Sequence, residues 1–152
     1  AYLPGTTDNF ASNEIIVSGL TAKQIWAQLD DTTLWPTYYS NVADIHFHDG
    51  SGPRLSANAR FRFSTFGFPI EAQITEYVPP ADGQAARIAW HGWAEGDATT
   101  RLDVIHAWLF EDLTQESQIG VPAQELARTL PNPMINGHQE WISGLVTSAR
   151  SE

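Results

Sequence analysis

His106 is the residue whose type and position point most directly to chemistry. In the expected strand 100–110 it belongs to an alternating series that is otherwise apolar. The other members of the series are Leu102, Val104, Trp108 and Phe110. We expect this series to face the core, so that an ionisable imidazole lies among apolar side chains, where it can donate, accept or transfer a proton near neutral pH. The alternative is a structural histidine that a hydroxyl or a backbone carbonyl satisfies, and contact with a ligand is compatible with either role.

Glu116 and His138 are two more ionisable residues that could reach the same interior. Glu116 belongs to an expected strand 113–119, neither face of which is clearly apolar. A buried Glu116 would have a raised pKa and could act as an acid or base, whereas an exposed one would be an ordinary surface carboxylate. His138 lies on the apolar face of the expected C-terminal helix, where it either closes over the interior or pairs with Glu140 near the surface. Both alternatives stay open for each residue.

Asp44, His46 and His48 alternate along one expected strand and have the spacing of ligands for zinc or another divalent cation. Ile45 and Phe47 occupy the opposite face and are the better candidates for the core. We therefore favour a solvent-exposed position for the three polar groups. No companion motif supports a metal, and we expect no cofactor.

Composition and motifs exclude several classes of function. The 152 residues include no cysteine, which removes disulfides, thiol nucleophiles and cysteine-based zinc sites. Eight basic and eighteen acidic residues give a net charge of −10, so we expect no nucleic-acid partner. The longest apolar runs fall far short of the roughly 20 residues that span a bilayer. The motifs of serine hydrolases, nucleotide-binding loops and zinc proteases do not occur in the chain.

Periodicity and turn residues predict one α+β domain over residues 13–152, preceded by a flexible arm over residues 1–12. A helix follows a short first strand, because Thr21 and Gln24 form a capping-box pattern, and a second short helix follows near residues 34–39. Strands are expected over residues 13–17, 42–48, 59–65, 70–78, 85–94, 100–110 and 113–119.

The end of the domain carries two further signals. Glu111–Asp112 is a poor hairpin turn, so either this hairpin is unusual or part of its loop is absent. A long helix begins near Asn132, and Gly137 and Gly144 lie close to its packing face. Glycine is costly inside a helix, so we expect a bulky group to approach this face closely.

A sheet of about six to seven antiparallel strands leaves one apolar face for a single C-terminal helix to cover. One helix cannot fill the concave side of a strongly curved sheet, so we expect an internal cavity for a small molecule. The alternative is that the same side chains fill the core and leave no space. The expected lining consists of Phe61, Phe63, Ile74, Ile88, Trp90, Val104, Trp108, His138 and Trp141.

A series of short motifs runs along almost the whole chain. They are Ile25–Asp30 followed by Leu34–Tyr39, Tyr77–Pro80 leading to Ile88–Trp90, His106–Glu111, Thr114–Gly120 and His138–Trp141. These motifs resemble those of the SRPBCC superfamily of START-like, polyketide-cyclase and pollen-allergen-like domains. The resemblance implies the helix-grip fold, a curved sheet wrapped around a long C-terminal helix, with two short helices after the first strand. The short turn after Phe110 departs from the superfamily pattern. Members bind, transport, cyclise or hydrolyse very different compounds, so the resemblance specifies the fold more than the activity.

We therefore expect a domain that binds one small, largely apolar molecule of lipid, polyketide or aromatic type, with His106 as its polar anchor. One alternative is a cyclase- or dehydratase-like enzyme in which His106, with or without Glu116, acts as general acid or base with a pKa of about 6 to 7. Another is a protein-interaction domain without catalytic activity, which a filled core would favour. A homodimer is compatible with all three. No signal peptide is visible, although a cleaved leader would leave the same sequence, and we expect a cytoplasmic protein.

Overall fold

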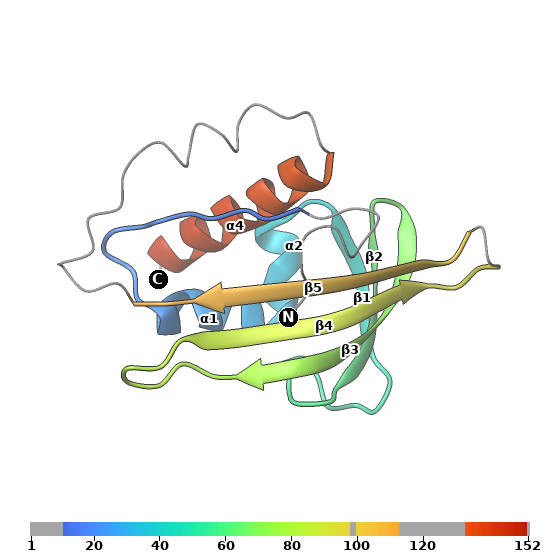
Figure 1. Cartoon of the computed structure of the whole chain (residues 1–152), viewed down its shortest axis with the longest axis horizontal. Coiled ribbons are helices and arrows are strands. Elements are labelled where there is room, and N and C mark those ends of the chain that lie inside the picture. The colour runs from blue at the N-terminus through green and yellow to red at the C-terminus, as the bar shows by residue number, and fades with distance from the viewer. Residues whose placement is uncertain (1–10, 98–99, 113–132, 152) are drawn as a thin grey trace.

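The computed structural model describes residues 11–97, 100–112 and 133–151. They form an α+β fold in which one antiparallel sheet carries helices on one face (Figure 1). The sheet has five strands in the order β1-β2-β3-β4-β5, so each strand pairs with its neighbours in the chain. The strands are β1 (Val42–Phe47), β2 (Arg60–Thr65), β3 (Phe68–Val78), β4 (Ala86–Ala94) and β5 (Leu102–Phe110).

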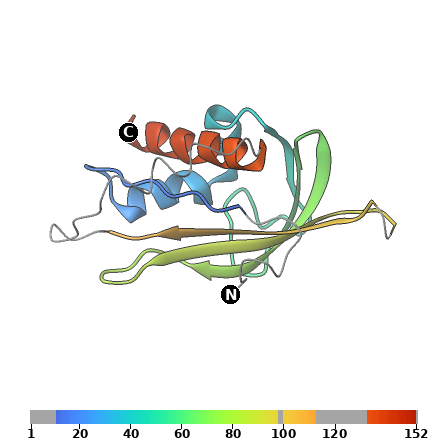
Figure 2. The same cartoon turned by 45° about the horizontal axis from the view of Figure 1, so that its top comes forward.

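The helices lie on one face of the sheet, which we call the inner face, as Figure 2 shows most clearly. The capping box is confirmed at α1 (Ala22–Asp30), where the backbone N–H of Thr21 donates to the Gln24 side chain at 2.9 Å. The 3-10 turn η1 (Thr32–Leu34) and α2 (Trp35–Tyr38) follow, and α4 (Pro133–Arg150) packs beside α1 and α2. Among the described residues no helix is long and apolar enough to cross a membrane.

The expected sheet of six to seven strands is wrong, because the sheet that the described residues form has five strands. Residues 13–17, expected as the first strand, form no ladder and instead run past α4, where Asn13 Nδ2 donates to Gln139 Oε1 at 3.5 Å. Ile15 and Ile16 stay 40% and 42% exposed, so the β-branched sequence buries too little surface here to hold a strand in place. The expected strand 113–119, with Glu116, and residues 1–10 of the expected arm lie outside the described residues.

The described chain continues only two residues beyond β5, and the second strand of the expected hairpin lies outside the described residues. β5 ends at Phe110, and the side chain of Asp112 accepts a hydrogen bond from the backbone N–H of Ala22 at 2.7 Å. A carboxylate at this position satisfies one of the free N–H groups at the start of α1. Its negative charge also interacts favourably with the positive end of the helix dipole. Asp112 therefore joins the end of the sheet to the first helix.

Gly137 and Gly144 lie where other elements approach α4 closely, as the sequence predicts. A β-carbon on Gly144 would collide with the backbone carbonyl of Tyr38, and one on Gly137 would lie 2.8 Å from Cζ of Phe66. The two glycines thus let α4 settle against α2 and against the turn between β2 and β3. This docking sets the height of α4 above the inner face.

Candidate functional site

The inner face of β5 carries a row of three rings: His106, Trp108 and Phe110. The ring centroids of His106 and Trp108 lie 5.2 Å apart, and those of Trp108 and Phe110 lie 6.3 Å apart. Trp141 of α4 packs edge-on against both His106 and Trp108, with centroids 5.2 Å from each. The expected alternation along this strand is therefore confirmed, and the series that contains His106 faces α4.

His106 and His138 meet across the interface between the sheet and α4. Their ring centroids lie 4.8 Å apart, and Trp90 lies 4.7 Å from His106 on the neighbouring strand. Neither imidazole makes a hydrogen bond with another residue of the described ranges. We call His106, Trp108, His138 and Trp141 the β5 cluster.

Both histidines of the β5 cluster are neutral at pH 7. His106 keeps part of its surface accessible, but burial among the rings and, to a smaller extent, the neighbouring His138 lower its pKa to about 3. Burial also lowers the pKa of His138. A neutral imidazole offers one donor and one acceptor. A pKa this far below the value of about 6 to 7 expected for an acid–base catalyst suits His106 to hydrogen bonding rather than to proton transfer near neutrality.

The indole Nε1 of Trp108 is a buried donor, and it has no acceptor among the described residues. Buried polar groups in folded proteins almost always have a hydrogen-bond partner, and leaving one without a partner costs about 1 to 3 kcal/mol. Because the two histidines beside it also make no hydrogen bond, the β5 cluster combines aromatic walls with unused donors and acceptors. Such an arrangement can hold a molecule that is mostly apolar and carries one polar group.

Most of the other residues expected to line a cavity pack into a filled core instead. Trp35 lies between the sheet and α4, with ring centroids 5.8 Å from Trp90 and 5.2 Å from Trp141. The sequence analysis did not assign Trp35 to the core, although its motif near residues 34–39 was recognised. The buried residues around it include Phe61, Phe63, Ile74 and Ile88.

Among the described residues, none covers one end of the inner face, beyond the start of α4. Leu102 on β5 is 47% exposed and Phe68 on β3 is 59% exposed, and both occupy inner-face positions by alternation. Gly92 and Ala94 stand opposite Val104 and Leu102 in the sheet register, so the neighbouring positions on β4 are small. We call this surface the apolar shelf; it consists of Phe68, Ala94, Leu102 and Val104, whereas Gly92 is buried beside Ile70. The shelf adjoins His106 directly.

Two hollows on the described surface lie away from the β5 cluster. One of about 490 Å³ lies between α2 and α4 and is lined largely by hydroxyl side chains. The other, of about 270 Å³, lies beside β1. Neither is lined by a residue that the sequence analysis placed in the cavity wall.

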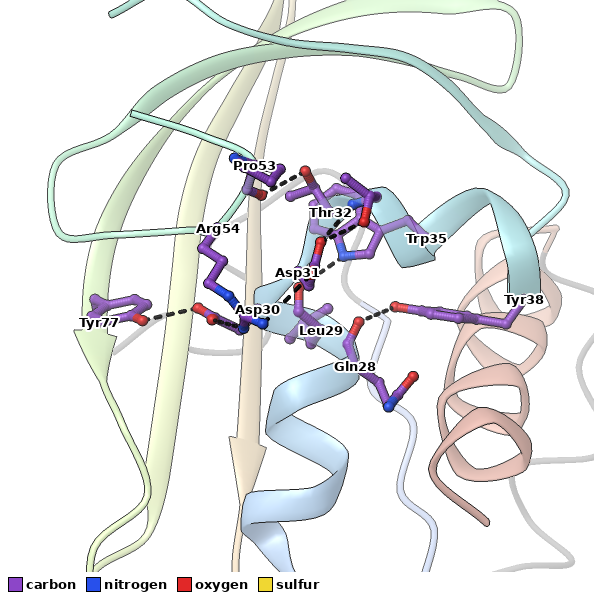
Figure 3. Close-up of polar contacts among 11 residues, drawn as sticks. Gln28, Leu29, Asp30, Asp31, Thr32, Trp35, Tyr38, Pro53, Arg54 and Tyr77 are labelled. Atoms are coloured by element: carbon purple, nitrogen blue, oxygen red, sulfur yellow. Dashed lines mark hydrogen bonds and ion pairs between the residues drawn. The ribbon is translucent and has the colours of Figure 1, made fainter. Parts of the chain in front are cut away.

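A polar cluster at the end of α1 holds Trp35 in place (Figure 3). The Nε1 of Trp35 donates to the backbone carbonyl of Leu29 at 2.8 Å. The adjacent carboxylate of Asp30 accepts from Arg54 at 3.0 Å and from the Tyr77 hydroxyl at 2.9 Å. Burial and this hydrogen bond raise the pKa of Tyr77 to about 12. These contacts tie α1, the loop before β2 and strand β3 together around the aromatic core.

The side chains considered as metal ligands are not gathered around one point. A bulge between Ala43 and His46 breaks the expected alternation, and Asp44 in it has a positive φ of 54°. His48 pairs with Glu71, with Nε2 and Oε2 2.6 Å apart. Within the described ranges no three histidine or carboxylate side chains form a group that could hold a metal ion.

Comparison with known proteins gives one informative relationship. No family model matches the chain, and no curated protein matches it. The chain is similar to the crystal structure of hypothetical protein jhp0584 from Helicobacter pylori, with 42% identity and a TM-score of 0.82. The similarity covers 97% of this chain and 91% of that one. The chain therefore belongs to the same family as the Helicobacter pylori protein jhp0584.

Proposed function

We propose that the protein binds one small, largely apolar molecule on the inner face of β5, with its polar group held by the β5 cluster. The observation that carries this proposal is the buried Nε1 donor of Trp108, which has no acceptor among the described residues and lies beside two neutral histidines. A ligand with a hydrogen-bond acceptor would satisfy this donor. This role is in keeping with the resemblance to the SRPBCC superfamily.

The ligand would lie between the β5 cluster and the apolar shelf. Trp35 fills the inner face between Trp90 and Trp141, so we place the bound molecule on the β5 side of these rings. Binding would cover Leu102 and Phe68, and burial of apolar surface stabilises a complex by about 25 cal/mol per Å². A completely filled core would favour the alternative of a protein-interaction domain. The exposed shelf and the Trp108 donor, which has no acceptor among the described residues, favour a small molecule.

We also propose a cytoplasmic location and no nucleic-acid partner. The net charge of −10 would repel a phosphate backbone, and this repulsion acts at any distance within the Debye length. A homodimer is compatible with ligand binding at the β5 cluster.

The test is a titration with the fluorescent aromatic ketone Prodan, whose emission changes when it leaves water. We expect saturable binding of one Prodan molecule per chain. Trp108→Phe keeps the apolar wall but removes the donor, so it should weaken binding about tenfold, which corresponds to about 1.4 kcal/mol for one hydrogen bond. His106→Phe should weaken binding in the same direction while the protein stays folded.

Trp93→Phe is the matched control. Trp93 lies on the outer face of β4, and its Nε1 already donates to Glu95 at 2.9 Å. This variant should bind Prodan as the wild-type protein does. Unsaturable binding to the wild-type protein, or equal affinities for wild type and Trp108→Phe, would contradict the proposed function.

A further inference from the structure

We infer that the bound molecule presents an uncharged polar group, a carbonyl or a hydroxyl, and that the site selects against carboxylates and phosphates. This inference rests on the proposed function and specifies its ligand class. It follows from where the chain places its positive charges, which can be followed residue by residue.

Seven of the eight lysine and arginine side chains belong to the described residues, and each of them lies away from the β5 cluster; the eighth, Arg128, lies outside those residues. Four arginines occupy outer-face positions of the sheet by alternation: Arg60, Arg62, Arg87 and Arg101. Arg54 is committed to Asp30 and Asp31, at 3.0 and 3.6 Å. Lys23 and Arg150 are exposed on the helices.

The histidines of the β5 cluster do not supply the missing positive charge. Burial lowers the pKa of both His106 and His138, so both are neutral near pH 7. An anion moved from water into this aromatic setting would lose its hydration without gaining a cation from the described residues, which is strongly unfavourable. The net charge of −10 adds a long-range repulsion of anions.

The cluster is well suited to a neutral acceptor. Trp108 provides one buried N–H, and His106, two residues earlier on the same face, provides a second donor in its neutral form. A carbonyl oxygen has two lone pairs and therefore matches two neighbouring donors. A ketone, ester or quinone on a flat apolar skeleton would use the rings and the donors together.

The experiment measures displacement of Prodan at pH 7.5 by three compounds that share one skeleton: naphthalene, acetylnaphthalene and naphthoate. We expect acetylnaphthalene to displace Prodan at concentrations at least tenfold lower than naphthoate. In Trp108→Phe, displacement by acetylnaphthalene should weaken about tenfold, whereas displacement by naphthalene, which has no acceptor, should not change.

A gain-of-function variant tests the electrostatic reasoning independently. Val104 lies on the inner face beside His106 near the end that no described residue covers, where the long stem of a lysine can keep its ammonium close to water. Val104→Lys should improve displacement by naphthoate at least tenfold. Ile105→Lys, on the opposite face of the same strand, is the matched control and should leave the order of the three compounds unchanged.

The outcomes separate the two proposals. If wild-type protein binds Prodan and naphthoate displaces it as well as or better than acetylnaphthalene, the inference is overturned and the proposed function stands. If Prodan does not bind saturably, the proposed function itself fails. A tenfold preference for acetylnaphthalene that depends on Trp108 supports both.

Discussion

Histidine side chains have opposite environments on the two faces of the sheet. On the inner face, His106 has Trp90, Trp108 and Trp141 around it, and no hydrogen bond joins it to a described residue. On the outer face, His91 lies one strand away, and its Nε2 is 2.9 Å from Asp103. His48 shares this outer arrangement through its contact with Glu71.

The outer face as a whole is a surface of paired charges. Asp103 accepts from both His91 and Arg101, and these hydrogen bonds lower its pKa to about 2. Arg87 donates to Glu76 at 2.7 Å. Exposed pairs of this kind contribute little to stability, because water competes for the same groups. Their effect is mainly to leave few polar groups on this face without a partner.

This difference in hydrogen bonding makes the inner face the exception, because polar side chains there lack partners among the described residues. Trp90 and His91 are neighbours in the sequence, and the alternation of the strand alone sends one to each face. The chain pairs His48 and His91 with carboxylates on the outer face, yet it leaves His106 and Trp108 without hydrogen bonds to described residues in the interior, where a missing partner is most costly. Departures of this kind concentrate at functional sites, which is why we place the ligand there.

The largest effect we expect is on the free energy of unfolding, when a lysine replaces one histidine on each face of the sheet. His106→Lys would bury an ammonium among aromatic rings without a carboxylate, and should lower the free energy of unfolding by about 3 kcal/mol or more. His91→Lys would keep a cation beside Asp103 and should change it by less than about 1 kcal/mol. Urea denaturation at pH 7.5 measures both.

A folded control separates loss of the imidazole from gain of the charge. His106→Phe keeps the ring stacking and should be about as stable as the wild-type protein. If His106→Lys proves as stable as His91→Lys, the inner face is hydrated and the contrast between the faces does not hold.

The second-largest effect we expect is a fall in the free energy of unfolding as the pH is lowered. His106 has a pKa of about 3 in the folded protein and near 6.5 in the unfolded chain, so acid favours the unfolded state. Stability should be fully present above about pH 6.5 and fall below it, by up to about 1.4 kcal/mol per pH unit from this group. The lowered pKa of His138 acts in the same direction.

The contribution of the outer face to stability is lost in a different pH range. The lowered pKa of Asp103 contributes stability above the ordinary carboxyl range, which is lost as pH falls through that range toward 2. The difference in urea midpoint between wild type and His106→Phe, followed from pH 7.5 to pH 4, therefore isolates the contribution of His106. His106→Phe should flatten this part of the profile and His91→Gln should not; equal slopes for wild type and His106→Phe would show that His106 is not desolvated.

Local sequence patterns correctly predicted the features of the fold that depend on neighbouring residues alone. The capping box at Thr21 predicted the start of α1, and the alternation around His106 predicted which face of β5 meets the helix. Elements that depend on a partner far away in the sequence were harder to predict. Residues 13–17 have the composition of a strand but no ladder partner, so the sheet has one strand fewer on that account.

The site was predictable in residue type and less so in arrangement. His106 and His138 stood out as ionisable groups on apolar faces, but their contact depends on how α4 docks. Gly137 signalled a close approach without naming Phe66 as the group that approaches. The filling of the core by Trp35 could not be read from its short motif, because it depends on three separate elements packing around one ring.

The smallest effect we expect lies on the outer face. Arg101→Gln removes the strongest of the two contacts that lower the pKa of Asp103, so this pKa should rise toward its ordinary value but not reach it, because His91 remains. A carboxyl NMR titration measures the rise. The urea midpoint at pH 7.5 should hardly move, since an exposed pair contributes little. His106→Phe should leave the Asp103 titration unchanged, because the two groups lie on opposite faces of the same strand; a shift there would mean that the faces are coupled and cannot be assigned separate roles.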